Sequence, residues 1–147
     1  MSWQMKMVNG LSRSIVKPAI RRAAAARVDN PLETLAKLRH WVVKLDNFLS
    51  RSHQTGRQVA GQPSYLWIDE APGATKVVLY LHGGGMVINA PGVYLAFTHR
   101  LSAAVRARVL LIDYRLAPEH PYPAANDDCF AAYRWLIEHE KLDARQI

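Results

Sequence analysis

Cysteine and long apolar runs are scarce in this chain of 147 residues. The single cysteine, Cys129, has no second cysteine with which to form an internal disulfide, which is typical of proteins from a reducing compartment. The longest apolar stretches, 77–81 and 109–112, are far shorter than the roughly 20 residues needed to span a bilayer. The first residues also lack the apolar core of a signal peptide. We therefore predict a cytoplasmic protein without stable membrane insertion.

Acidic residues are scarce in the first part of the chain. Residues 1–57 hold 11 of the 19 Lys and Arg residues but only 3 of the 12 Asp and Glu residues. An anionic membrane surface, a transit peptide or nucleic acid would each fit a basic start. Because no nucleic-acid-binding motif accompanies the charge, we favour a solvated helical surface and expect no nucleic-acid partner. The histidines outside the glycine-rich segment are His40, His53, His99, His120 and His139. They do not have the spacing of metal ligands, so no metal is expected.

The N-terminal third of the sequence indicates helices. Leucine and valine recur at intervals of three and four between Asn30 and Ser50, which predicts an amphipathic helix. Its start is well marked, because Asn30 is a favoured cap, Pro31 suits the first helical position and Glu33 completes a capping box. Alanines favour an earlier helix over 15–27. We expect residues 1–55 to form a helical segment.

After residue 55 the pattern changes to short apolar runs bounded by turn formers. Strands are predicted over 65–69, 77–81 and 108–113, and helices over 94–106 and 124–141. Strands that alternate with helices of this length indicate an α/β sheet with parallel crossovers and helices on both faces. The nearly continuous apolar runs at 77–81 and 109–112 are typical of central strands that are covered on both sides. Residues 56–147 are thus expected to form an α/β domain.

The most informative segment is the predicted strand 77–81 with His82, Gly83, Gly84 and Gly85 directly after it. Hydrolysis of an ester passes through an intermediate whose oxygen is negatively charged, and fixed donors aimed at that oxygen lower the barrier. Glycines leave backbone amides open to such an oxygen, because they have no Cβ and tolerate positive φ. A simple glycine-rich turn is the alternative. A phosphate-binding loop fits poorly, since neither Gly-x-Gly-x-x-Gly nor Gly-Lys-Ser/Thr occurs.

Together with the motif from Asp113 to Ala125, this segment closely resembles the hormone-sensitive-lipase-like carboxylesterases, also called the bacterial family IV esterases. The resemblance implies the N-terminal part of an α/β-hydrolase sheet, preceded by a helical, cap-like segment over residues 1–55 that covers the substrate. It further implies that the amides of Gly83, Gly84 and Gly85 line an oxyanion hole, while His82 shapes the loop and is not the catalytic base. The implied substrate is a small-molecule ester of a short or medium acyl chain, and no cofactor is needed.

The segment from 114 to 125 reads by itself as a strand end followed by a proline-rich scaffold. Arg115 and Glu119 are candidates for an ion pair that braces the loop beside the glycines, although an exposed pair of little energetic value is an equal alternative. One residue departs from the family pattern. Met86 follows the glycines where the family usually has an aromatic residue, which leaves the shape of the acyl pocket open.

The catalytic serine of this family lies in a Gly-x-Ser-x-Gly turn, followed by an acidic residue and a histidine, and no such pentapeptide occurs here. Cys129 is a poor substitute because it falls within a predicted helix. We therefore expect a truncated esterase that carries the oxyanion loop without the triad and is inactive alone. The alternative is a non-catalytic binding or interaction protein derived from an esterase. In either case, the strand 77–81 is expected to lack its family neighbours and to promote self-association through an open sheet edge.

Overall fold

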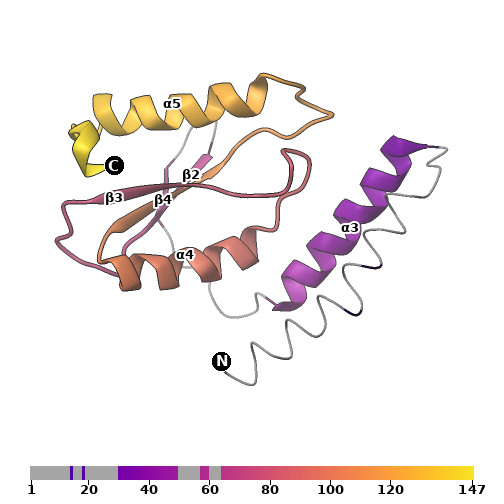
Figure 1. The fold of residues 1–147 in the computed structure, drawn as a ribbon, viewed down its shortest axis with the longest axis horizontal. Helices are drawn as coiled ribbons and strands as arrows, with labels where there is room; N and C mark the ends of the chain where they lie inside the picture. Colours follow the sequence, from indigo (N-terminus) through magenta and orange to yellow (C-terminus); the bar gives the residue numbers. More distant parts are fainter. Residues whose placement is uncertain (1–13, 15–17, 19–29, 50–56, 60–63) are drawn as a thin grey trace. The chain divides into compact units, whose positions relative to one another are not determined.

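The computed structural model describes residues 14, 18, 30–49, 57–59 and 64–147 (Figure 1). The chain divides into two compact units, residues 1–36 and residues 37–147. The second unit contains the described sheet and its helices, apart from the start of one helix that begins in the first unit. The helix predicted over 15–27 lies almost entirely outside the described residues, and the domain boundary between 55 and 56 stays a prediction.

Helix α3 covers Pro31–Leu49 and confirms the amphipathic helix predicted from the leucine spacing. Its start has the predicted cap, because the Asn30 side chain accepts the Glu33 amide at 3.2 Å. The less exposed side of the helix is not the leucine stripe alone. Arg39 and the buried Asp46 lie seven residues apart on one face, whereas Leu45 is 57% exposed. Leucine periodicity detects an amphipathic helix, but it does not show which polar side chains face the rest of the fold.

Four strands form one mixed sheet in the order β1-β2-β4-β3. They cover Arg57–Val59, Ser64–Ile68, Val77–Leu81 and Arg108–Asp113 in chain order. Only β3 and β4 are parallel, while β2 is antiparallel to both β1 and β4. The parallel pair and its connecting helix confirm the predicted α/β architecture. Strand β1 and the antiparallel pairings were not predicted from the sequence.

Strand β3 lies at the edge of the sheet within the described residues, where it pairs only with β4. Its apolar run is typical of a central strand, but the edge position agrees with the expectation that this chain lacks the family neighbours of the strand. Its last residue, Leu81, is 48% exposed, whereas β4 is almost completely buried and is central as predicted. An apolar run shows that a strand has two faces to cover, but strand order depends on pairing with other segments.

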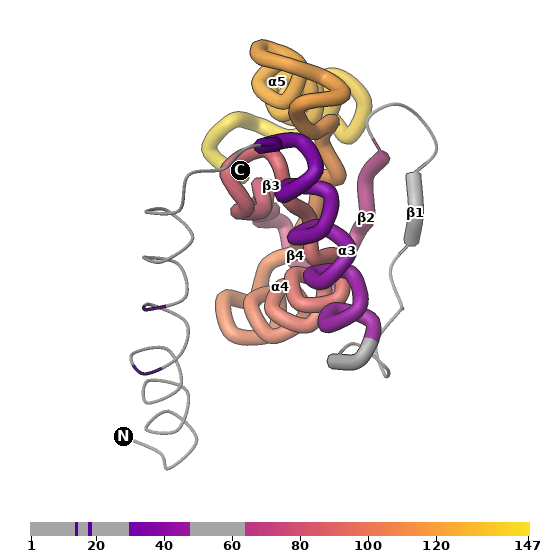
Figure 2. The backbone as a smooth tube through the Cα atoms, turned by 90° about the vertical axis from the view of Figure 1, so that its right-hand side faces the viewer, coloured from indigo at the N-terminus to yellow at the C-terminus, as the bar shows by residue number. Residues whose placement is uncertain are grey.

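Two helices cover opposite faces of the sheet, as Figures 1 and 2 show. Helix α4, Pro91–Val105, packs with Leu95 against Val109 and Leu111 of β4. Helix α5, Ala124–Glu138, packs on the other face against the alternate residues of the same strand. A short 3-10 helix, Ala144–Gln146, follows it. The predicted covering of both faces is confirmed.

Candidate active site

Two loops meet at the carboxyl ends of the parallel strands β3 and β4. The first runs from His82 to Ala90 and leads into α4, and the second runs from Tyr114 to Pro123 and leads into α5. A hydrogen bond between backbone groups joins the two loops: the Ala117 amide donates to the Met86 carbonyl at 2.9 Å. In open α/β sheets, ligands bind at this end of the strands. The fold thus places both motifs from the sequence side by side at the usual ligand edge.

His82 is buried at the base of the glycine loop and is only 4% exposed. Its ring stacks on Tyr114 with 4.1 Å between ring centroids and also faces Tyr94 at 5.2 Å. Nδ1 donates to the Gly83 carbonyl at 2.9 Å, and because a carbonyl only accepts, Nδ1 carries the proton. Within the described residues Nε2 has no hydrogen-bond partner. This geometry suits a residue that shapes the loop.

Tyrosine hydroxyls hold the first two carbonyl groups of the glycine loop. Tyr114 donates to the His82 carbonyl, and Tyr94 donates to the Gly83 carbonyl at 2.8 Å. Burial raises the pKa of Tyr114 to about 12, with smaller contributions from nearby acidic groups, so its hydroxyl remains a donor at physiological pH. Since peptide groups are planar and trans, each held carbonyl directs the N–H of the following glycine the opposite way.

Glycine is required at position 84 for two reasons. Gly84 has φ +126°, and a Cβ there would lie 2.0 Å from the Ile88 carbonyl oxygen. Its own carbonyl accepts the amides of Val87 and Ile88 at 3.2 and 3.1 Å, which closes the turn. Gly85 follows with φ +63° and Met86 with φ +59°. Met86 therefore adopts a left-handed conformation that L residues rarely occupy, and the surrounding contacts must hold it.

The amide groups of Gly83, Gly84 and Gly85 remain open. All three residues are exposed, and within the described part of the chain their N–H groups donate to no acceptor. The carbonyl groups of residues 82–84 thus accept hydrogen bonds within the protein. The N–H groups of the same three peptide units, which belong to residues 83–85, have no acceptor among the described residues. Unused, fixed backbone donors of this kind suit an oxygen that becomes negatively charged during a reaction.

The proline-rich loop is braced, although not by the pair considered from the sequence. Arg115 does not bind Glu119. Its backbone amide, Nε and Nη2 all bind the carboxylate of Asp128 in α5, with Nη2 at 2.7 Å from Oδ1. Burial opposes ionisation of Asp128, but these hydrogen bonds outweigh it and hold the pKa of the carboxyl below its ordinary value. Spacing along the chain favoured Glu119, whereas the fold brings Asp128 closer.

Glu119 instead pairs with Arg39 of α3 at 2.6 Å, and this hydrogen bond lowers the pKa of the Glu119 carboxyl. Sequence reasoning did not single out Arg39. The only available signal was an arginine on the less exposed side of an amphipathic helix.

Asp46 is the second polar residue of α3 that sequence reasoning missed. It is 4% exposed, and its two carboxylate oxygens accept the amides of Gly92 and Val93, each at 2.8 Å. These N–H groups lie in the first turn of α4 and have no acceptor within the helix. The cap position of α4 is Ala90, which offers no side-chain acceptor. Asp46 therefore caps a helix that its own sequence leaves uncapped.

Cys129 is not placed for nucleophilic attack. It lies within α5 and is partly buried, and desolvation together with Asp128 raises the pKa of its thiol. The thiolate is thus disfavoured at neutral pH. Among the described serines after residue 55, Ser102 is completely buried in α4 and donates to the Ala107 carbonyl, while Ser64 begins β2. Neither lies in a strand-to-helix turn.

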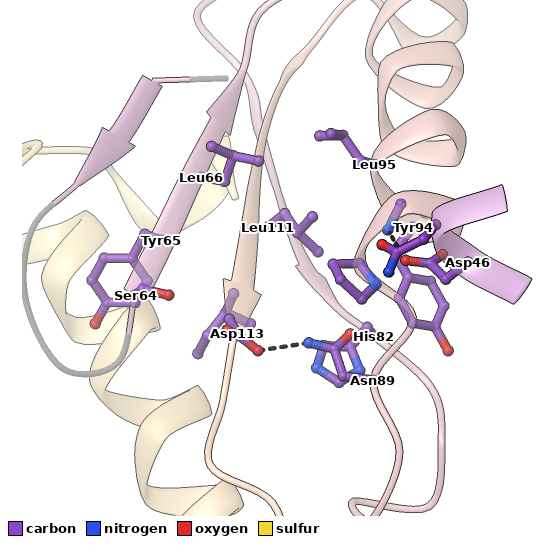
Figure 3. A pocket seen from close by; sticks show the side chains of 14 residues that line it. Asp46, Ser64, Tyr65, Leu66, His82, Asn89, Tyr94, Leu95, Leu111 and Asp113 are labelled. Atoms are coloured by element: carbon purple, nitrogen blue, oxygen red, sulfur yellow. Dashed lines mark hydrogen bonds between the residues drawn. The ribbon is translucent and has the colours of Figure 1, made fainter. Parts of the chain in front are cut away.

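A pocket of about 430 Å³ lies beside His82, lined by residues from α3, β2, β4 and the start of α4 (Figure 3). On its wall Asn89 donates to Asp113 at 2.6 Å. Gly83, Gly84 and Gly85 do not line this pocket. Elsewhere in the described residues, no helix has the length and apolarity to cross a bilayer, and no cluster of metal-ligating side chains occurs.

The fold is that of part of an α/β hydrolase, and the glycine loop resembles the one found in such proteins. Residues 78–147 match the family described as having the alpha/beta hydrolase fold. Esterase LipI of Mycobacterium tuberculosis is 49% identical over 70 residues, which cover 48% of this chain and 21% of the relative. The carboxylesterase/phospholipase LipF of the same organism is 47% identical over 66 residues, or 45% of this chain and 18% of the relative. The chain thus spans about a fifth of these relatives.

Solved structures lead to the same group. The esterase EstE5, in crystals soaked with ethyl alcohol, matches 81% of this chain and 39% of its own with 32% identity and a TM-score of 0.65. A hormone-sensitive lipase from a metagenome library matches 88% of this chain and 43% of its own with 28% identity and a TM-score of 0.63. The predicted resemblance is therefore confirmed: within the α/β hydrolases, the chain is similar to the hormone-sensitive-lipase-like carboxylesterases.

Proposed function

We propose that residues 82–85 form the oxyanion hole of a serine carboxylesterase, with the amides of Gly83, Gly84 and Gly85 as its donors. The observation that carries this proposal is the set of three exposed N–H groups whose accompanying carbonyls are all bound by the protein. In the reaction, a serine hydroxyl attacks the ester carbonyl carbon, and the carbonyl oxygen becomes an anion that these amides stabilise. Expulsion of the alcohol leaves an acyl-serine, which water then hydrolyses.

The serine, its acidic partner and its histidine base lie, in this proposal, outside the 147 residues, because the sequence contains no Gly-x-Ser-x-Gly. The chain then supplies the oxyanion half of a site that acts on short or medium acyl esters in the cytoplasm. By itself it is inactive.

Hydrolysis of p-nitrophenyl butyrate tests the proposal. The assay uses two proteins, the 147-residue chain and the gene product extended by whatever its reading frame encodes after Ile147. We expect turnover only from the extended protein. In that protein, a substitution that displaces the amides of Gly83, Gly84 and Gly85 should lower kcat about 100-fold or more. Turnover by the 147 residues that is abolished by a substitution within them would refute the absence of the nucleophile. An extended protein with a serine turn but no activity would refute the assignment.

A non-catalytic interaction protein is the second candidate, favoured by the absence of a serine turn from the sequence. A stop codon directly after Ile147 in intact transcripts would support it. We further propose that the 147-residue chain self-associates through β3, since this strand has one bonded neighbour within the described residues and ends in the exposed Leu81. Size-exclusion chromatography checks this, and a compact, stable monomer would contradict it.

A further inference from the structure

Arg39 of α3 joins three acceptors from two different loops. Its Nε donates to the Val87 carbonyl at 2.6 Å, its Nη1 to Glu119 Oε1 at 2.6 Å, and its Nη2 to the Ala117 carbonyl. The side chain is 24% exposed. A planar guanidinium with its donors fixed in one fork is suited to hold several acceptors in a defined arrangement, whereas a lysine ammonium makes a single point contact.

Two of these acceptors are directly connected to the proposed oxyanion hole. Val87, whose carbonyl accepts from Arg39, donates its own amide to the Gly84 carbonyl at 3.2 Å. Ala117, whose carbonyl also accepts from Arg39, donates its amide to the Met86 carbonyl at 2.9 Å. The guanidinium thus holds both sides of the bond that joins the glycine loop to the proline-rich loop.

The glycine loop needs such support. Gly84, Gly85 and Met86 form three consecutive positive-φ positions, and Met86 has a Cβ that disfavours this conformation. Within the described residues, the hydrogen bonds that anchor the Met86–Val87 stretch are the backbone bonds to Gly84 and Ala117 and the bond from Arg39. Catalytic donors must lie close to the productive geometry to contribute, and a displacement of about 1 Å costs about 100-fold in rate.

We propose that Arg39 is a positioning residue that holds the glycine loop with its amides in place for the developing oxyanion. This inference rests on the proposed function for its catalytic consequence, but not for the contacts themselves. It gives α3, which sequence reasoning assigned to a substrate-covering cap, a second task as a brace for the catalytic loop.

Glu119 provides the matched control. Its carboxylate is 59% exposed, and a surface ion pair contributes little to stability. If Arg39 acted mainly through this pair, E119Q and R39K would have similar effects. If it acts through the two carbonyls, E119Q leaves those contacts in place, while R39K breaks at least one of them.

Amide hydrogen exchange on the 147-residue chain tests the brace directly. In R39K and R39A we expect exchange at the bonded amides of Val87, Ile88 and Ala117 to rise about tenfold, while the amides of the central strand β4 stay protected. E119Q should match the wild type. Intact β4 protection shows that a variant is folded. Unchanged loop exchange in a folded R39A variant would overturn the proposal.

Kinetics on the extended gene product test the catalytic consequence. We expect R39K to lower kcat for p-nitrophenyl butyrate about 10- to 100-fold with KM and melting temperature nearly unchanged, because only the transition-state contact is disturbed. E119Q should keep the wild-type kcat. An inactive wild type would count against the proposed function, and hydrogen exchange would still decide on the brace. An active wild type with an equally active R39K variant would overturn the positioning role.

Discussion

Replacing Asp46 by asparagine should measurably destabilise the fold, although the two side chains are nearly isosteric. The carboxylate accepts the amides of Gly92 and Val93 at 2.8 Å each. An asparagine has a single oxygen at this place, so its amide group must face one of the two N–H donors, and the charge that favours a helix N-terminus is lost.

The size of the effect depends on the burial of the site. Removing a cap costs about 0.5–2 kcal/mol, and a charge near a helix end contributes up to about 2 kcal/mol where it is partly buried. At 4% exposure Asp46 belongs near the upper end of both ranges. We therefore expect D46N to lose about 2 kcal/mol of the free energy of unfolding. With a urea dependence of about 2 kcal/mol per molar, the midpoint should fall by about 1 M.

Urea unfolding followed by circular dichroism measures this shift. D127N is the matched control, because Asp127 also lies in the first turn of a helix but is exposed. Its loss should stay below about 1 kcal/mol, the value typical of exposed charges near a helix end. Equal midpoints for D46N and D127N would refute the claim that Asp46 caps α4.

Three further outcomes are expected from the site. G84A should lower the free energy of unfolding by more than about 2 kcal/mol or reshape the loop, because its Cβ would lie 2.0 Å from a carbonyl oxygen. G83A, whose Cβ would lie 3.6 Å from the Tyr94 hydroxyl, should have a mild effect. Thermal unfolding of both variants measures this, and equal losses would contradict the strain argument. The folded-state pKa of Asp128 lies below the unfolded value of about 3.9, so the stability that Arg115 provides is present above that value and is lost as the pH falls through the folded one. Acid unfolding of D128N should accordingly show a weaker dependence on pH below about 4 than that of the wild type, and parallel curves would exclude the pair as a source. Cys129 should react with a disulfide reagent more slowly than free cysteine at pH 8, since its pKa is raised, and rapid modification of the folded chain would show that the thiol is accessible as thiolate.

Much of the fold could be read from local sequence. The strands 77–81 and 108–113 were predicted at their observed bounds, and the helix beginning at Ala124 was predicted at its start. Periodicity and turn residues determine these elements because they act over a few neighbouring positions. The three glycines after β3 likewise marked the loop, since only a residue without a Cβ fits at Gly84.

The tertiary structure decided how these pieces meet. It paired Arg115 with Asp128 and directed Arg39 and Asp46 of α3 to the loop and to the start of α4. None of these contacts can be deduced from spacing along the chain, because a charged group binds whichever opposite partner folding brings within about 3 Å. The sequence by itself determined that glycines leave the backbone amides of residues 83–85 without a covering side chain. Long-range contacts decided what holds these amides in place.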